Sequence, residues 1–337
     1  MAARFDPDSP AEGGLYGLPV EPRDARVVVL PVPYEATTSS GHGTSGGPAA
    51  VLEASHQVDL CAPATAQHWQ HGLAMLPAPE AVLEVADEAL KAAECVRNAS
   101  RPDSERDRAL ARVNAASLQV QEAVHSAVAD LLDAGQIPAV LGGDHSVPLG
   151  AIAAAVERCP GMGILHVDAH ADLREAYEGF DQSHASILHN VLELHALGPV
   201  VQVGIRDFGM REHARFTSDP QLHTWTDEAI SDAMAEGATW MSLVHRMLEP
   251  LPQQLWITFD VDGLDPSLCP ATGTPVPGGL SWNQARQLLN AVARSGRTVV
   301  GFDLCEVSDQ PWDATVGARL LYHLAGVAVV SQLEGAP

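Results

Sequence analysis

The sequence predicts an α/β fold in which helices cover both faces of a mostly parallel sheet. Three observations lead to this prediction. Short apolar runs rich in β-branched residues recur along the 337 residues. The segments between these runs carry apolar residues three and four positions apart, as on one face of a helix. The two kinds of segment alternate, which is typical of parallel strands joined by helical crossovers.

Six runs are expected to form strands. They are short, apolar and bounded by polar or turn-forming residues, at 26–32, 137–141, 163–167, 200–205, 255–261 and 298–304.

Two segments between these runs have a clear helical stripe. In 110–132 the stripe is ended by Gly135 and Pro138, which form a helix stop. In 147–159 the apolar residues recur at the same spacing. The most polar stretch, 97–112, is expected to be a solvated loop or a helix start inside a domain. No repeat or linker interrupts the chain, so we expect an N-terminal arm at 1–24 and a single domain at 25–330.

Composition excludes several classes of function. Lys and Arg number 19 against 43 Asp and Glu, giving a net charge of -24, which repels nucleic acid and anionic membranes. The same charge mildly favours a cationic substrate. Uninterrupted apolar runs fall short of the ~20 residues of a membrane span, and the N-terminus lacks an apolar signal. Five cysteines without a CxxC pair indicate reduced thiols and a cytoplasmic protein.

Charged and imidazole side chains follow four of the expected strands directly. In doubly wound sheets, ligands bind outside the carboxyl ends of the strands, so these positions are candidates for a site. The clusters are GGDHS with His145, DAHAD with Asp168, His170 and Asp172, DVD with Asp260 and Asp262, and Cys305-Glu306.

The spacing of these residues points to metal ions. Alternate residues leaving a strand point to the same side, so DAHAD presents three ligands together and DVD adds two. Four or five adjacent carboxylates would be strongly destabilising without cations. Six candidate ligands exceed what one tetrahedral zinc requires, which favours two ions that share bridging carboxylates and a water. Oxygen-rich ligation suits manganese, with nickel, iron, cobalt and zinc left open.

Each cluster taken alone has a purely structural interpretation. An Asp-His pair after a strand is commonly a helix cap, GGDHS can be a glycine turn in which Asp144 caps the next helix, and DVDGLDP can be a turn. The metal interpretation is favoured because all of these clusters follow strands that are expected to belong to one sheet.

These motifs resemble the ureohydrolase superfamily, which includes arginase, agmatinase and formiminoglutamase. The shared segments are GGDHS, DAHAD, FDVDGLDP with ATGTPVPGG, and LCEVSD, and the likeness runs from about Val27 to about Leu324. The resemblance implies a three-layer α/β/α arginase-type fold, usually assembled as trimers or hexamers. It also implies two manganese ions that activate a bridging hydroxide as the nucleophile.

The resemblance also implies individual roles. One metal takes His145, Asp168, Asp172 and Asp260, and the other takes Asp168, His170, Asp260 and Asp262. His184 matches the family's proton-transfer histidine, and Asp172 is a second candidate for proton transfer. Glu306 matches the carboxylate that pairs with the substrate guanidinium, a bidentate partner of the right shape.

The substrate is expected to be a small cationic guanidine. Arg174 and Gly209 stand where arginase has residues that hold the amino acid end of arginine, and both departures argue against arginine. The agmatinase-like AHADLREAYEG stretch favours agmatine, hydrolysed to putrescine and urea. Aminopropylagmatine, guanidinobutyrate, guanidine and formiminoglutamate remain alternatives. The irregular loops near 36–46, 174–186 and 206–215 are expected to contact the substrate tail and to select it. His42, in the first of these loops, is expected to contact the substrate.

Two further hypotheses compete with a ureohydrolase. A single-zinc amidohydrolase of the deacetylase type shares the fold but lacks counterparts of His145 and of the doubled aspartate in DVD. A non-catalytic subunit usually has a broken ligand set, whereas all six candidate ligands are present here.

Overall fold

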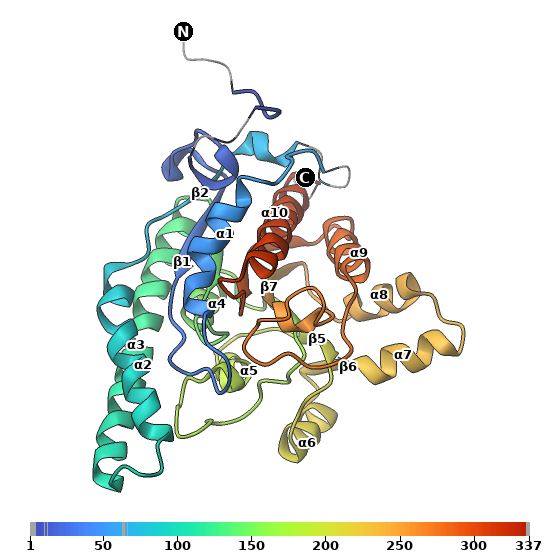
Figure 1. Ribbon diagram of the computed structural model, residues 1–337. Coiled ribbons are helices and arrows are strands. Elements are labelled where there is room, and N and C mark those ends of the chain that lie inside the picture. Colours follow the sequence, from blue (N-terminus) through green and yellow to red (C-terminus); the bar gives the residue numbers. More distant parts are fainter. Residues whose placement is uncertain (1–4, 10, 12, 63–64, 66, 335–337) are drawn as a thin grey trace.

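One parallel sheet of eight strands forms the centre of the molecule (Figure 1). The computed structural model describes residues 5–9, 11, 13–62, 65 and 67–334. The strand order is β2-β1-β3-β8-β7-β4-β5-β6, and every neighbouring pair is parallel. The strands are β1 (Val27–Val32), β2 (Leu73–Met75), β3 (Ile137–Gly142), β4 (Gly163–Val167), β5 (Val200–Ile205), β6 (Leu222–Thr226), β7 (Gln254–Asp260) and β8 (Thr298–Cys305).

All six strands expected from the sequence are confirmed. The two that the apolar pattern did not predict, β2 and β6, lie at the two edges of the sheet. The first has three residues, and the second is half-buried along most of its length. Neither therefore needs the continuous apolar run that marks a strand covered on both faces.

Helices cover both faces of the sheet, which gives the expected three layers (Figure 1). Side chains that alternate along each strand divide between two cores. One face packs against α1, α8, α9 and α10, and the other against α2, α3, α4 and α5. The α-helices are α1 (Gly47–Ser55), α2 (Glu80–Arg97), α3 (Asp103–Asp133), α4 (Leu149–Arg158), α5 (Ile187–Leu192), α6 (Met210–Ser218), α7 (Asp227–Ala235), α8 (Trp240–Leu248), α9 (Trp282–Ala293) and α10 (Pro311–Glu334).

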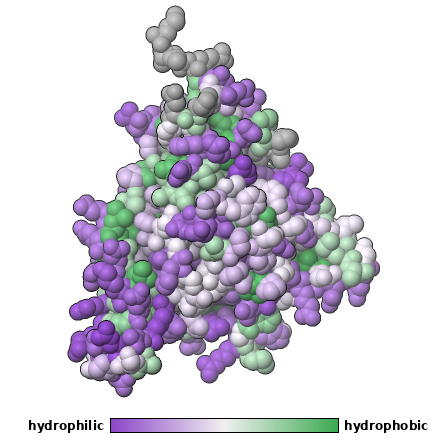
Figure 2. Space-filling view, viewed as in Figure 1, coloured by the Kyte–Doolittle hydropathy of each residue, from purple (hydrophilic) through white to green (hydrophobic). Residues whose placement is uncertain are grey.

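The two expected helical segments are confirmed as α3 and α4. The polar stretch 97–112 contains a short turn and the start of α3, whose first turn carries Asp103 and Glu105. Acidic residues at this end stabilise a helix because they face its positive dipole. Hydrophilic side chains cover this end of the α2–α3 pair in the space-filling view (Figure 2).

The C-terminal helix α10 belongs to the core. By length and composition Pro311–Leu333 could cross a membrane, but 83% of its most apolar window is buried inside the molecule. It packs against α1, α9 and β8. Its apolar residues lie on all sides of the helix. It therefore lacks the one-sided apolar stripe from which a helix is predicted in a sequence.

The segment expected to be an N-terminal arm also reaches the core. Of residues 1–24, positions 1–4, 10 and 12 lie outside the described residues. Leu15, Tyr16 and Leu18 are buried, and the Tyr16 hydroxyl donates a 2.8 Å hydrogen bond to the Ala318 carbonyl in α10. The boundary between residues 24 and 25 stays a prediction.

The strand order brings the candidate motifs together. The strands that lead into GGDHS, DAHAD, DVD and Cys305-Glu306 are β3, β4, β7 and β8, which are four consecutive neighbours at the centre of the sheet. Because these strands are parallel, their carboxyl ends meet at one edge. The loops that follow β1 and β5 flank this edge on either side.

Candidate metal centre and active site

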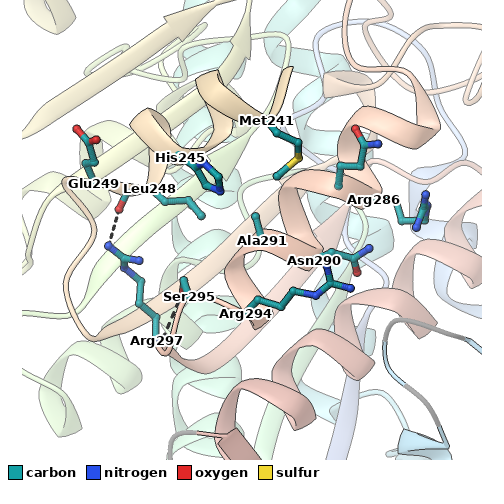
Figure 3. A pocket seen from close by; sticks show the side chains of 11 residues that line it. Met241, His245, Leu248, Glu249, Arg286, Asn290, Ala291, Arg294, Ser295 and Arg297 are labelled. Atoms are coloured by element: carbon teal, nitrogen blue, oxygen red, sulfur yellow. Dashed lines mark hydrogen bonds between the residues drawn. The ribbon is translucent and has the colours of Figure 1, made fainter. Parts of the chain in front are cut away.

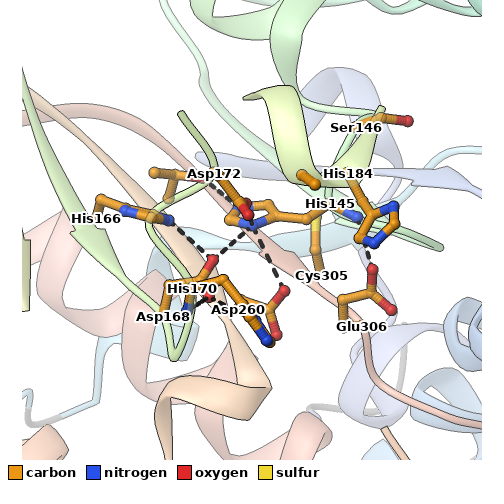
Figure 4. Close-up of polar contacts among 12 residues, drawn as sticks. His145, Ser146, His166, Asp168, His170, Asp172, His184, Asp260, Cys305 and Glu306 are labelled. Atoms are coloured by element: carbon orange, nitrogen blue, oxygen red, sulfur yellow. Dashed lines mark hydrogen bonds and ion pairs between the residues drawn. The ribbon is translucent and has the colours of Figure 1, made fainter. Parts of the chain in front are cut away.

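His145 lies at the centre of a buried group of carboxylates (Figure 4). Its Nδ1 atom is 2.9 Å from Asp168 Oδ2, 3.3 Å from Asp172 Oδ2 and 3.4 Å from Asp260 Oδ2. All four side chains are at most 5% exposed. The structure therefore gathers the four residues expected to hold one ion.

The other nitrogen of His145 faces away from these carboxylates. Nε2 is 2.9 Å from the Thr258 hydroxyl, which donates in turn to Asp303 Oδ1 at 2.9 Å. Because the hydroxyl proton is engaged by Asp303, the Thr258 oxygen accepts from His145, which places the imidazole proton on Nε2. Nδ1 is thereby left to face the carboxylates with its lone pair.

His170 forms a second group beside the first. Its Nδ1 atom is 2.9 Å from Asp262 Oδ2 and 3.5 Å from Asp168 Oδ1. Asp168 therefore presents one oxygen to each histidine, as a bridging carboxylate would. Asp260 accepts a 2.8 Å hydrogen bond from the Asp262 backbone through its Oδ1 atom, which fixes the DVD turn between the two groups.

Burial and mutual repulsion perturb the protonation of these groups. Burial, followed by the charges of Asp262 and Asp168, raises the pKa of Asp260 well above its usual range. Burial and the charge of Asp168 raise the pKa of Asp172 to about 6. For His170, burial lowers the pKa, but the charge of Asp262 and the hydrogen bond with Asp168 outweigh it and raise the value to about 12.

The donor set fits divalent cations. The described residues contain the clusters His145, His166, Asp168 and Asp172, and Asp168, His170 and Asp262, with ligand atoms in each cluster within 4.8 Å of one another. Asp168 belongs to both. A bound cation would offset the repulsion among the carboxylates and favour their ionised forms. Imidazole nitrogens combined with several carboxylate oxygens match the ligand preferences of manganese and related ions.

Glu306 lies beside this cluster at the end of β8. Its Oε1 accepts a 3.0 Å hydrogen bond from the His145 backbone, while Oε2 is buried without a hydrogen-bond partner among the described residues. A Cβ atom added to Gly273 would come within 3.1 Å of Oε2, so glycine leaves space there. Burial and the nearby Asp144 raise the pKa of Glu306 well above its usual range.

Backbone strain marks two of the candidate residues. Asp172 has a φ of 54° and Glu306 a φ of 61°, in the left-handed region that non-glycine residues seldom adopt. Such conformations cost on the order of 1–3 kcal/mol and persist where surrounding contacts hold them. Strain of this kind gathers at functional sites, and here it falls on two residues predicted from the motifs.

His184 is held by the loop that follows β1. Its backbone donates a 3.0 Å hydrogen bond to the Thr37 hydroxyl, and its Nε2 is 3.3 Å from Ser39 Oγ. Thr37 in turn donates to Asp144 through both its backbone and its hydroxyl. Burial and the positive charge of His170 lower the pKa of His184 to about 4. Its imidazole is therefore uncharged at neutral pH.

A cavity of about 370 Å³ opens over the cluster. Its lining includes the candidate site residues His170, Asp172 and His184, together with Arg174, Tyr177, Asp207 and Glu212. The three loops expected to read the substrate thus contribute to it, together with the unexpected segment 273–276. His42 does not line it, because its exposed side chain lies 3.9 Å from Glu35 instead.

A larger cavity of about 810 Å³ lies between α8 and α9, away from these motifs (Figure 3). Arg286, Arg294 and Arg297 line it with His245. Arg297 uses its guanidinium to hold the Leu248 and Leu251 carbonyls. None of the candidate metal ligands borders this cavity.

The sequence motifs missed a row of buried polar residues beneath the site, which we name the polar row. Its members are register partners on adjacent strands, and four of the five are fully buried: Asp303, Thr258, His166, Gln202 and Thr224. A signal was available in the sequence, because a polar residue stands inside otherwise apolar strands, two positions before Asp168 and before Asp260.

Comparison with known proteins identifies the family. The model of the arginase family matches residues 25–326. The chain belongs to the arginase family. The class predicted from the motifs, a ureohydrolase-superfamily enzyme acting on C–N bonds of linear amidines, is thereby confirmed.

Relatives within the arginase family differ in how much of this chain they match. N(1)-aminopropylagmatine ureohydrolase from Thermus thermophilus is 35% identical over 306 residues, covering 90% of each chain. Agmatinase from Bacillus anthracis is 36% identical over 183 residues, which is 54% of this chain and 59% of the relative. The structure of agmatine ureohydrolase from Thermoplasma volcanium matches with a TM-score of 0.70 at 22% identity, covering 94% of each chain, and confirms the arginase-type fold.

Proposed function

We propose that this enzyme is a two-metal ureohydrolase that releases urea from a guanidinoalkyl amine. The observation that carries this proposal is the buried Oε2 of Glu306, which has no hydrogen-bond partner among the residues that the structure describes and lies beside a cluster of metal-type ligands. A buried carboxylate oxygen needs a donor, and a guanidinium offers two parallel N–H groups to a carboxylate. Glu306 would thus hold the guanidinium with its carbon next to the cluster.

The proposed ligand sets follow the two groups in the structure. His145, Asp168, Asp172 and Asp260 would hold one divalent ion, and Asp168, His170, Asp260 and Asp262 the other. When bound, such ions lower the pKa of a water and supply a nucleophile at neutral pH.

The protein groups around this water would handle the proton and the leaving amine. Asp172, which lines the cavity, would accept a proton as the water attacks the guanidinium carbon. Hydrolysis then breaks a C–N bond, and the departing amine takes up a proton. His184 lines the same cavity, held by Thr37 and Ser39, and its uncharged imidazole would relay to the amine the proton that Asp172 accepted.

The walls of the cavity favour a tail without a carboxylate. Arg174 stacks over the Tyr177 ring at 4.6 Å, and its Nε is 3.5 Å from Glu212 Oε2. Its charge is therefore already offset by Glu212, which also accepts 2.7 Å and 3.1 Å hydrogen bonds from the Gly209 and Leu173 backbones. Asp207 lies at the same cavity with its Oδ2 atom 4.0 Å from His170 Nε2, and its side chain is 68% exposed, so its carboxylate is accessible to an ammonium.

Among amines of this kind, N(1)-aminopropylagmatine is the first candidate and agmatine the second. The sequence motifs favoured agmatine, but the agmatinase relative aligns with about half of the chain, whereas the aminopropylagmatine ureohydrolase aligns with nine tenths. The longer substrate also carries an additional ammonium that Asp207 can attract.

A substrate panel tests this proposal. Urea release is measured with Mn²⁺ on N(1)-aminopropylagmatine, agmatine, arginine and guanidinobutyrate, and formamide release on formiminoglutamate. We expect the highest kcat/KM on N(1)-aminopropylagmatine and loss of activity after chelation, with about two ions per chain restoring it. Preference for arginine or guanidinobutyrate would contradict the tail assignment. Inactivity on every substrate, or one zinc per chain, would contradict the function itself.

A further inference from the structure

Three of the five residues of the polar row have no role in the chemistry described above. His166 in β4 pairs in register with Gln202 in β5, which pairs with Thr224 in β6. His166 and Gln202 are completely buried. Buried polar side chains are costly unless they are hydrogen-bonded, so a connected group of this kind at a candidate metal centre calls for a role.

The hydrogen bonds fix the orientation of the Gln202 amide. The Ala171 carbonyl can only accept, and Gln202 Nε2 donates to it at 2.9 Å. The opposite end of the amide, Oε1, accepts from the Thr224 hydroxyl at 2.7 Å. Both contacts agree, so Gln202 presents N–H groups toward Ala171 and toward His166.

This orientation in turn assigns the proton on His166. Gln202 Nε2 is 3.1 Å from His166 Nδ1, and because the amide donates, Nδ1 accepts. The imidazole proton is then on Nε2, which donates to Asp168 Oδ2 at 2.9 Å (Figure 4). A ring nitrogen that carries a proton has no lone pair for a metal. His166 therefore is not a metal ligand, although its ring lies among candidate ligands.

We propose that His166, held by Gln202, is a positioning residue that orients Asp168 as the bridging carboxylate. Asp168 Oδ2 lies between His166 Nε2 and His145 Nδ1, both at 2.9 Å, while Oδ1 faces His170 and accepts from its backbone at 2.6 Å. The hydrogen bond from His166 prevents the carboxylate from rotating away from the two histidines that it separates. This inference rests on the metal-binding function proposed above.

Two substitutions of His166 test its hydrogen bond to Asp168 separately from the space that its side chain fills. In His166→Gln the terminal amide nitrogen occupies a position like that of Nε2 and can still donate to Asp168. In His166→Asn the amide reaches only as far as Nδ1, so it can meet Gln202 but not Asp168. Gln202→Leu is a second variant, which leaves His166 in place and removes the group that orients its ring.

The measurement is Mn²⁺ affinity by competition with a chelator, together with metal content and the melting temperature of each metal-free variant. We expect His166→Asn to bind Mn²⁺ about 10- to 100-fold more weakly than the native protein, as for other residues that orient metal ligands. His166→Gln should stay within about threefold, and Gln202→Leu should weaken binding in the same direction as His166→Asn. At saturating Mn²⁺ the KM for agmatine should stay unchanged in every variant.

The results that would contradict the positioning role of His166 can be told apart from those that would contradict the proposed function. Native affinity in His166→Asn and Gln202→Leu would overturn the positioning role. Equal loss in His166→Gln and His166→Asn, with three coordinated imidazole nitrogens counted by pulsed EPR of the Mn²⁺ protein, would make His166 a ligand instead. A native protein that binds no divalent ion would contradict the proposed function, whereas native binding with unaffected variants contradicts only this inference. If His166→Asn does not fold, Gln202→Leu carries the test.

Discussion

Replacing Glu306 with glutamine should lower activity without lowering stability. The side chain keeps its shape, and its carbonyl oxygen can still accept the 3.0 Å hydrogen bond from the His145 backbone. What changes is the other end of the side chain, where the buried Oε2 loses its charge. An amide at this position offers the guanidinium at most one acceptor and presents an N–H group against its donors.

The expected size of the effect follows from that one contact. A hydrogen bond to a charged group contributes about 1.5–3 kcal/mol. At about 1.4 kcal/mol per factor of ten, Glu306→Gln should reduce kcat/KM for agmatine roughly 10- to 150-fold. The metal content should be unchanged, because the proposed ligand sets do not include Glu306.

Stability should change in the opposite direction, with a defined pH dependence. The pKa of Glu306 is raised in the folded protein, chiefly by burial and then by Asp144. A carboxyl group whose folded pKa is raised contributes stability at low pH and loses it as the pH rises through that value. The melting temperature of metal-free Glu306→Gln should therefore match the native value near pH 4.5 and exceed it by about 2–4 °C at pH 8.

Urea release and thermal unfolding of the same preparations provide the measurement. Glu306→Asp, which keeps the charge but shortens the side chain, is the matched control and should lose activity without the gain at pH 8. Native kcat/KM in Glu306→Gln would refute the guanidinium role. A loss of activity accompanied by lower metal content and a lower melting temperature would show that Glu306 supports the fold rather than the substrate.

Three other substitutions give independent predictions. Thr258→Val removes the acceptor for His145 Nε2 and should weaken Mn²⁺ binding about tenfold. Thr258→Ser keeps the hydroxyl and should retain native Mn²⁺ affinity. Equal affinity of the native protein and both variants would contradict the proton position assigned to His145. His184→Asn should lower kcat about 100-fold with KM and metal content unchanged, and a native kcat would exclude His184 from proton delivery. Asp207→Asn should raise KM for N(1)-aminopropylagmatine about threefold to tenfold and for agmatine less, because the longer amine carries the additional charge; an equal effect on both substrates would contradict the proposed tail contact.

Local sequence patterns were sufficient for the central strands. The six predicted strands are covered on both faces, so each is a mostly apolar run with a defined end. Strands β2 and β6 and helix α10 escaped prediction for physical reasons. An edge strand such as β6 can be half-polar, and a helix buried on every side carries no one-sided stripe.

The sequence by itself also determined which residues compose the candidate site. Asp168 and Asp260 stand directly after apolar runs, and His145 follows such a run after Gly-Gly-Asp. The spacing within DAHAD and DVD places alternate side chains on one side of each strand. This part of the prediction needs only the local sequence, because the side chains of any strand alternate between its two faces with a period of two residues. Glu306 was also singled out because it follows an apolar run, and its role as the partner of the guanidinium was inferred from motif likeness.

Only the tertiary structure decided how these residues meet. The order β3-β8-β7-β4 makes neighbours of strands that are far apart in the sequence, such as β3 (Ile137–Gly142) and β8 (Thr298–Cys305), and no local pattern encodes that order. It also aligned His166 with Gln202 and Thr258 with Asp303 beneath the site. A hydrogen bond across strands depends on register, and register is set by the packing of the whole sheet. The candidate ligands could therefore be predicted from the sequence, whereas the side chains that we propose to orient them were identified only from the fold.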